Sequence, residues 1–179
     1  MASQVQGDNE SRVLLRDANG DYQTYLTKYI TRFDGGYSDG SQFVAYFDAL
    51  NNATGKGYDV TSIVCIEIPE GTLRVSNTYS KTSTCKNLMY VKAPSTLVYQ
   101  QYTSYNACSN LKVIDYSKAS ITNLDQEFIT NNSSIEVVYY PSTVQKIGKW
   151  SLHGTRNLSS VYVPASLQSA ESMILRMGF

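Results

Sequence analysis

A short motif recurs from residue 63 toward the C-terminus: an apolar residue, a second apolar residue three positions later, and a proline three positions after that. The copies are 25, 23, 24 and 23 residues apart and start at Ile63, Leu88, Leu111, Ile135 and Leu158. In the third copy, Ser117 stands at the proline position. A period of about 20 to 29 residues is typical of solenoids, in which each unit buries its apolar side only against neighbouring units. The repeat therefore predicts a stack of coils that share one continuous core.

The part of each unit that follows the proline repeats as well. Cys108 lies fourteen residues after Pro94, and Thr155 lies fourteen residues after Pro141, so the two residues are equivalent. Cys85 occupies the same position one coil earlier, which predicts that Cys85 and Cys108 stack one strand spacing of about 4.8 Å apart. That separation allows a disulfide, although we favour inward stacking of two reduced thiols.

These units resemble the BspA-like leucine-rich repeat family, whose consensus is approximately L-x-x-I-x-I-P-x-S-V-T-x-I-G-x-x-A-F-x-G-C. Residues 135–155 carry the resemblance best, because Ile147 and Gly148 match the I-G pair and residues 151–155 take the place of A-F-x-G-C. The resemblance implies a strand-rich α/β repeat solenoid of about five coils over residues 59–179. It implies a shape more than an activity, because this family is defined by its fold.

Alternation along each expected strand sets one face toward the core and the other toward solvent. The inward pairs are Ile66 and Ile68, Val91 and Ala93, Ile114 and Tyr116, Val138 and Tyr140, and Val161 and Val163. The outward residues are the candidate binding residues, namely Tyr90, Lys92, Val113, Asp115, Val137, Tyr139 and Tyr162. They form either a recognition surface or ordinary cross-strand pairs on a solvated sheet, with Lys92 and Asp115 placed to pair.

A hairpin is expected before the repeat begins. Residues 12–16 and 22–26 alternate in the manner of strands, and the Asn19-Gly20 pair between them favours a tight turn. Residues 28–33 either extend this hairpin or form a third strand.

Residues 1–58 as a whole do not fit the repeat, and we assign them to a separate N-terminal module. Ser41 is a candidate N-cap for a short helix over residues 41–50, whose apolar side chains fall on one face. The hairpin and the helix either cap the first coil, as solenoids require, or attach the chain to a larger assembly.

Several function classes are disfavoured by composition. The formal net charge of +0 lacks the basic character that nucleic-acid binding needs, and no apolar run is long enough to insert into a membrane. His153 is the one histidine, no cysteine pair has zinc-ligand spacing, and no pair of carboxylates recurs on one face. We therefore expect no catalytic residue, no metal, no cofactor and no enzymatic activity.

Two non-enzymatic functions remain. The first is a structural or recognition scaffold on the exterior of a virion, such as a phage particle, or of another surface assembly. It is favoured because the first residues contain no apolar secretory segment and the solenoid ends look open to assembly. The second, which the family resemblance implies, is an adhesin-type binding module on a bacterial surface. In both, the partner is a protein or a glycan, and the chain is expected to form an oligomer or a larger assembly.

Overall fold

The structure is a computed structural model of the whole chain. It describes residues 10–16, 22–28, 32–34, 63–68, 70–76, 86–100, 105 and 108–171. This part contains thirteen strands and no helix, so the helical share of the expected α/β class is not found there. The predicted helix over 41–50 lies outside the described residues. Within the described ranges, no helix could span a membrane.

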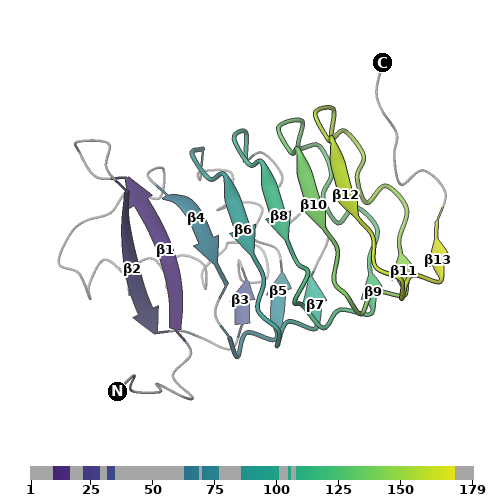
Figure 1. Cartoon of the computed structure of the whole chain (residues 1–179), viewed down its shortest axis with the longest axis horizontal. Coiled ribbons are helices and arrows are strands. Elements are labelled where there is room, and N and C mark those ends of the chain that lie inside the picture. Colours follow the sequence, from purple (N-terminus) through teal and green to yellow (C-terminus); the bar gives the residue numbers. More distant parts are fainter. Residues whose placement is uncertain are drawn as a thin grey trace.

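The first wall of the solenoid is a parallel sheet with one strand from each coil (Figure 1). Its strands are β4 (Ile63–Glu67), β6 (Tyr90–Lys92), β8 (Val113–Asp115), β10 (Val137–Tyr139) and β12 (Ser160–Tyr162). Equivalent residues of neighbouring units pair in register, as Tyr90 does with Val113 and Val113 with Val137. This confirms the solenoid predicted from the repeat, with four full turns of chain between β4 and β12.

The N-terminal hairpin is also confirmed, and it extends this sheet. Strand β1 (Glu10–Arg16) pairs antiparallel with β2 (Tyr22–Lys28) on one side and with β4 on the other. The backbone groups of β4 that face away from β6 are therefore paired. The third strand, β3 (Arg32–Asp34), does not extend the hairpin but crosses to the second wall.

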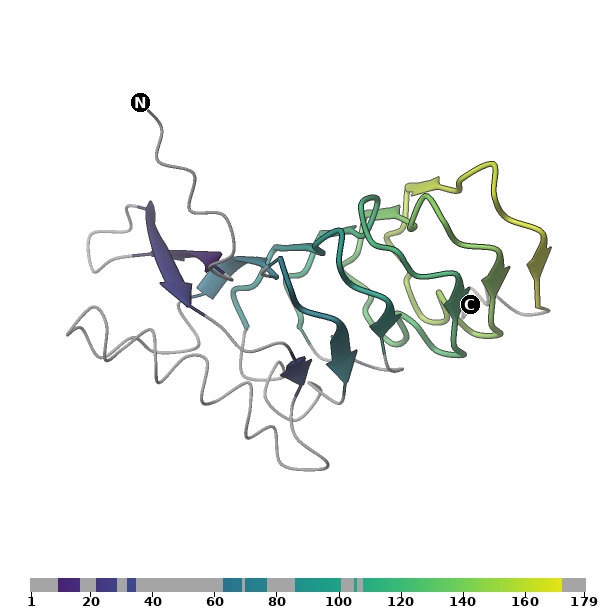
Figure 2. The same cartoon turned by 90° about the horizontal axis from the view of Figure 1, so that it is seen from below.

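The second wall lies on the opposite side of the stacked coils (Figure 2). It consists of β3 together with β5 (Arg74–Ser76), β7 (Tyr99–Gln100), β9 (Asn123–Leu124), β11 (Lys146–Ile147) and β13 (Ser169–Ala170). These strands form two three-stranded parallel sheets, β3-β5-β7 and β9-β11-β13. Both walls thus repeat at the spacing of the sequence motif.

The core fills the space between the walls with the side chains that alternation predicts to face inward. The inward pairs of β4, β6, β8 and β10 and of the residues after them are each at most 4% exposed. The last coil departs from the prediction, because Val161 is only partly buried and Val163 is 51% exposed. No described coil follows to cover them. The predicted stacking of Cys85 on Cys108 cannot be followed, since Cys85 lies outside the described residues, but Cys108 is buried.

Equivalent turns of neighbouring coils also repeat their backbone conformation. Glu127 and Trp150 both have a φ of 59° and lie one unit apart, and Asn131 (54°) is matched in the same way by Gly154 (78°). A positive φ is uncommon for residues other than glycine, so its recurrence at equivalent positions reflects a shared coil path. The turns at residues 127–131 and 150–154, in two consecutive coils, therefore follow the same backbone path.

Candidate binding surface

The outward side chains of the first wall form what we call the outer strand surface. It contains all the residues predicted for binding, namely Tyr90, Lys92, Val113, Asp115, Val137, Tyr139 and Tyr162. In β6, β8 and β10 the central residue is buried and the two residues that flank it are half-buried, as alternation requires, and in β12 the exposed residue is Tyr162. The structure therefore brings the predicted residues together on one face, in two rows that run across the strands.

Two aromatic rings dominate the C-terminal end of the outer strand surface. Tyr139 and Tyr162 are paired residues of β10 and β12, and their rings stack with centroids 4.4 Å apart and planes 10° from parallel. Tyr162 is 56% exposed, so one face of the stack is open to solvent. Rigid, solvent-open aromatic rings are typical of the residues that contribute most to binding at protein interfaces.

The middle of the outer strand surface is organised by Asp115. Its Oδ2 accepts a hydrogen bond from the Tyr90 hydroxyl at 3.2 Å, and its Oδ1 accepts from the Ser117 backbone N–H at 3.0 Å and the Ser117 hydroxyl at 2.6 Å. Ser117 stands where the other units have proline, which has no N–H to donate. The departure from the motif thus supplies two of the three hydrogen bonds that hold this carboxylate.

The predicted pairing of Lys92 with Asp115 is wrong. The Lys92 ammonium instead lies 3.5 Å from Glu67, one strand in the other direction, because the Asp115 oxygens are occupied by Tyr90 and Ser117. Each side chain of the Lys92–Glu67 pair is 35% exposed, so solvent screens it and its net contribution to stability is small.

The Cys65 thiol and the Tyr90 phenol on this face are held in their uncharged forms. Burial, with Glu67 nearby, raises the pKa of the Cys65 thiol to about 11, and burial together with Asp115 raises the pKa of Tyr90 above its ordinary value. A thiol with so high a pKa is almost entirely protonated at neutral pH and is a poor nucleophile. The outward Cys65 therefore behaves as a small apolar side chain of the surface.

Met89 belongs to the same face and was not predicted. It directly precedes β6, is 43% exposed, and occupies the position at which the later coils carry Lys112, Glu136 and Ser159. An apolar residue where the three later units are polar was the available signal. Lys112 and Glu136 form an ion pair at 2.6 Å beside it, so this margin of the surface combines one apolar and two charged groups.

Metal binding finds no support in the described part of the chain. It holds no group of three or more histidine, cysteine, aspartate or glutamate side chains that could ligate an ion. His153, at the variable position of its unit, is half-buried in a turn away from both walls.

Comparison with known proteins agrees with the architecture. No curated protein sequence matches the chain. Among solved structures, a leucine rich cell surface protein from Faecalibacterium prausnitzii A2-165 aligns with 17% sequence identity and a TM-score of 0.36. That alignment covers 84% of this chain and 37% of the solved one, so the chain spans well under half the length of that protein. The profile of the BspA type leucine rich repeat region matches residues 57–176 in six copies. The chain belongs to the BspA-type leucine-rich repeat family.

Proposed function

We propose that the chain is a non-enzymatic recognition scaffold that binds a protein or glycan partner through the outer strand surface. The observation that carries this proposal is the stacked pair of Tyr139 and Tyr162, held in register by β10 and β12 and open on one face. The two tyrosine side chains lose little conformational freedom when a partner binds, because the strands and the ring stack already hold them in place. Such preorganisation lowers the entropic cost of association.

The remaining outward residues suit the same role. Next to the rings, Val113 and Val137 are half-buried apolar neighbours, and Asp115 is held in place by Ser117. An apolar centre bordered by fixed polar groups is typical of protein interfaces.

The scaffold is proposed to work on the exterior of a virion or another surface assembly, and to have no catalytic activity. A second candidate is an adhesin-type module on a bacterial cell surface, which the membership in the BspA-type family favours. Immunogold labelling with an antibody against the purified chain separates the two. Gold on particles supports the first, gold on the cell envelope supports the second, and gold confined to the cell interior contradicts both.

Binding through the outer strand surface is tested with two double variants. Tyr139→Ser/Tyr162→Ser removes the ring stack, and Gln145→Ser/Gln168→Ser changes two exposed side chains of the second wall at the same unit spacing. We expect any partner captured by the unmodified chain on protein and glycan arrays to bind at least tenfold more weakly to the tyrosine variant. Surface plasmon resonance should show unchanged affinity for the glutamine variant. Equal affinities for all three proteins would contradict the proposal.

Assembly is tested by the solution mass of the full chain, measured by light scattering beside a chain that begins at Asp59. We propose that residues 1–58 attach the chain to its neighbours. An oligomer that becomes a monomer when these residues are removed supports this role, and a full-length chain that is already a monomer contradicts it.

A further inference from the structure

Asp115 is an acid of the outer strand surface that has no cation beside it. The other two acids on this face and at its margin form ion pairs, Glu67 with Lys92 at 3.5 Å and Glu136 with Lys112 at 2.6 Å. Within the described residues, no ammonium or guanidinium group lies at ion-pair distance from Asp115. Three acids and two lysines therefore leave this face with one negative charge that is not neutralised.

The Asp115 carboxylate is held in place and can still accept a hydrogen bond. Ser117 donates twice to Oδ1, and the Tyr90 hydroxyl donates once to Oδ2. An ionised carboxylate offers roughly four lone pairs to donors, so Oδ2 keeps one of its two. The side chain is half-buried, which leaves it within reach of a partner. All of its present donors are neutral groups, so a charged donor would add what they do not supply.

The Tyr139 ring stands next to this carboxylate. Tyr139 pairs with Asp115 on one side and with Tyr162 on the other. The two tyrosine rings are 4.4 Å apart and nearly parallel, which is close to the strand spacing of about 4.8 Å. One face of the Tyr139 ring therefore lies against Tyr162 and the other is turned toward β8, where no described ring covers it. The short Asp115 side chain lies beside this second face.

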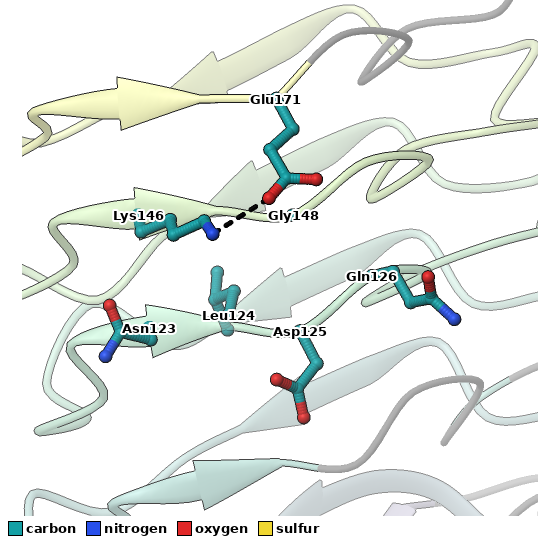
Figure 3. A pocket seen from close by; sticks show the side chains of 7 residues that line it. All are labelled: Asn123, Leu124, Asp125, Gln126, Lys146, Gly148 and Glu171. Carbon is teal, nitrogen blue, oxygen red and sulfur yellow. Dashed lines mark ion pairs between the residues drawn. The ribbon is translucent and has the colours of Figure 1, made fainter.

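On the second wall, the corresponding acids are matched by cations of the chain itself. The Asp125 carboxylate points toward the preceding coil (Figure 3) and accepts a hydrogen bond from the Tyr99 hydroxyl. The guanidinium group of Arg74, the residue that pairs with Tyr99, lies 4.5 Å from the centre of the Tyr99 ring. Glu171 is paired in turn with Lys146 at 2.8 Å (Figure 3). Tyrosine, aspartate and arginine thus form one group on this wall.

The first wall repeats the tyrosine and the aspartate of this group but not its cation. Tyr90 donates its hydroxyl to Asp115 of the next coil, as the tyrosine of the second wall does. The residue that pairs with Tyr90 is Cys65, a small side chain that stands where the second wall has Arg74. The outward residues of β6, β8, β10 and β12 include no arginine. A guanidinium group is therefore the part of this arrangement that a partner can supply.

We propose that the outer strand surface binds an arginine side chain of a protein partner, with the guanidinium group against the Tyr139 ring and hydrogen-bonded to Asp115 Oδ2. A guanidinium group is flat, so it lies along an aromatic face and donates from its edge to a carboxylate. An ammonium group is compact and more strongly hydrated, and a neutral sugar leaves the charge of Asp115 without a partner. This inference rests on the proposed function, because it specifies the partner of the same surface.

The test compares two synthetic pentapeptides, one with arginine between two leucines and one with citrulline in place of the arginine. Citrulline has almost the same shape as arginine but carries no charge. Each peptide is titrated into the isotope-labelled full chain. The arginine peptide should shift the NMR signals of the Ser117 backbone N–H, which donates to Asp115, and of the Tyr139 ring. We expect the citrulline peptide to bind about tenfold more weakly.

A variant of Asp115 tests the other half of the contact. Asp115→Asn removes the charge with little change in shape, and it should weaken binding of the arginine peptide about tenfold while leaving the citrulline peptide nearly unaffected. The matched control is Asp125→Asn, which changes an aspartate that also accepts from a tyrosine hydroxyl but lies on the opposite wall. The control should bind both peptides normally. Melting temperatures verify that both variants fold, and the comparison of the two peptides on the unmodified chain requires no variant.

The remaining outcomes overturn the inference. Equal affinities for the arginine and citrulline peptides, or no shift at Ser117 and Tyr139 with either, would refute an arginine site. A lysine peptide that binds as tightly as the arginine peptide would refute the stacked guanidinium group. An array partner that is weakened by Tyr139→Ser/Tyr162→Ser but not by Asp115→Asn would refute this site and leave the proposed function standing. A partner that neither variant weakens would contradict the proposed function itself.

Discussion

Asn132 connects two coils through a buried side chain. Its Nδ2 donates to the backbone carbonyls of Tyr105 and Cys108, each at 3.3 Å, and its Oδ1 accepts from the Ser134 hydroxyl at 2.7 Å. It occupies the repeat position of Cys108 and Thr155, so one position carries a thiol, an amide and a hydroxyl in successive coils. The amide thus links its own turn to the turn of the preceding coil, where the Cys108 carbonyl also accepts from the Leu111 backbone N–H at 3.0 Å.

Replacing Asn132 with alanine is expected to lower the free energy of unfolding by about 1–3 kcal/mol, because the buried hydrogen bonds of the amide to Tyr105, Cys108 and Ser134 are lost. Urea denaturation followed by circular dichroism measures this change. Ser133→Ala, at the exposed neighbouring position, is the matched control and should stay within about 0.5 kcal/mol. A loss no larger than that of the control would mean that the amide does not carry the contact between the coils.

Tyr140 differs from Asn132 in the hydrogen bonding of its buried polar group. Its side chain is 3% exposed and packs 5.8 Å from the Phe128 ring, yet its hydroxyl has no hydrogen-bond partner among the described residues. Because an unpaired buried hydroxyl is costly, Tyr140→Phe is expected to raise the free energy of unfolding by about 1 kcal/mol. Urea denaturation at pH 8 measures the change in the free energy of unfolding, and Tyr162→Phe, at an exposed tyrosine, is the control. A destabilised Tyr140→Phe chain would reveal a partner for this hydroxyl.

The same substitution should change the response to alkali. Burial raises the pKa of Tyr140 above its ordinary value near 10, so the phenol stays protonated in the fold after it would ionise in the unfolded chain. The contribution of this group to stability is therefore complete below about pH 10 and is lost as the pH rises toward the pKa of the folded state. The unmodified chain should lose more stability than Tyr140→Phe between pH 8 and pH 11. Equal losses of stability in the two proteins would contradict the raised pKa of Tyr140.

Just past the ends of the paired strands β9 and β11, Gly148 lies against the backbone of residues 125 and 126. Gly148→Ala is expected to lower the free energy of unfolding by about 1–3 kcal/mol, because backbone rather than a flexible side chain must move. Thermal unfolding measures this, with Gln145→Ala, on the same wall and exposed, as control. A stable Gly148→Ala chain would show that the coils can separate without cost.

Across the whole solenoid, burial decreases toward the last coil. The central inward residues Ile114 and Val138 are fully buried, whereas Val161 is partly buried and Val163 is half exposed. Because each coil contacts only its neighbours, opening can begin at an end without disturbing the centre. Hydrogen exchange should therefore be slowest in β8 and β10 and faster in β12 and β13. Uniform protection of all five coils would mean that the stack unfolds as a single unit.

The sequence was sufficient to predict which residues share a row, because the repeat spacing sets the pairing of every strand from β4 to β12. It was not sufficient to predict which neighbouring side chains contact each other. Lys92 turns to Glu67 rather than to Asp115, and Glu171 reaches diagonally to Lys146, because side-chain length and competing donors decide these contacts. Ile147 and Gly148 were matched only to the I-G pair of the family consensus, which does not show how closely the backbone of residues 125 and 126 approaches Gly148.

Because equivalent residues of neighbouring coils pair in register, the molecule can gain or lose whole repeat units. Every strand of the first wall from β4 to β12 presents the same edge to the next, and the proximal edge of β4 is paired with the hairpin. A duplication or deletion of one unit in the gene would join two compatible edges. The molecule would then grow or shrink by one strand spacing, about 4.8 Å, while both ends and the hydrogen bonds of the remaining coils stayed as they are.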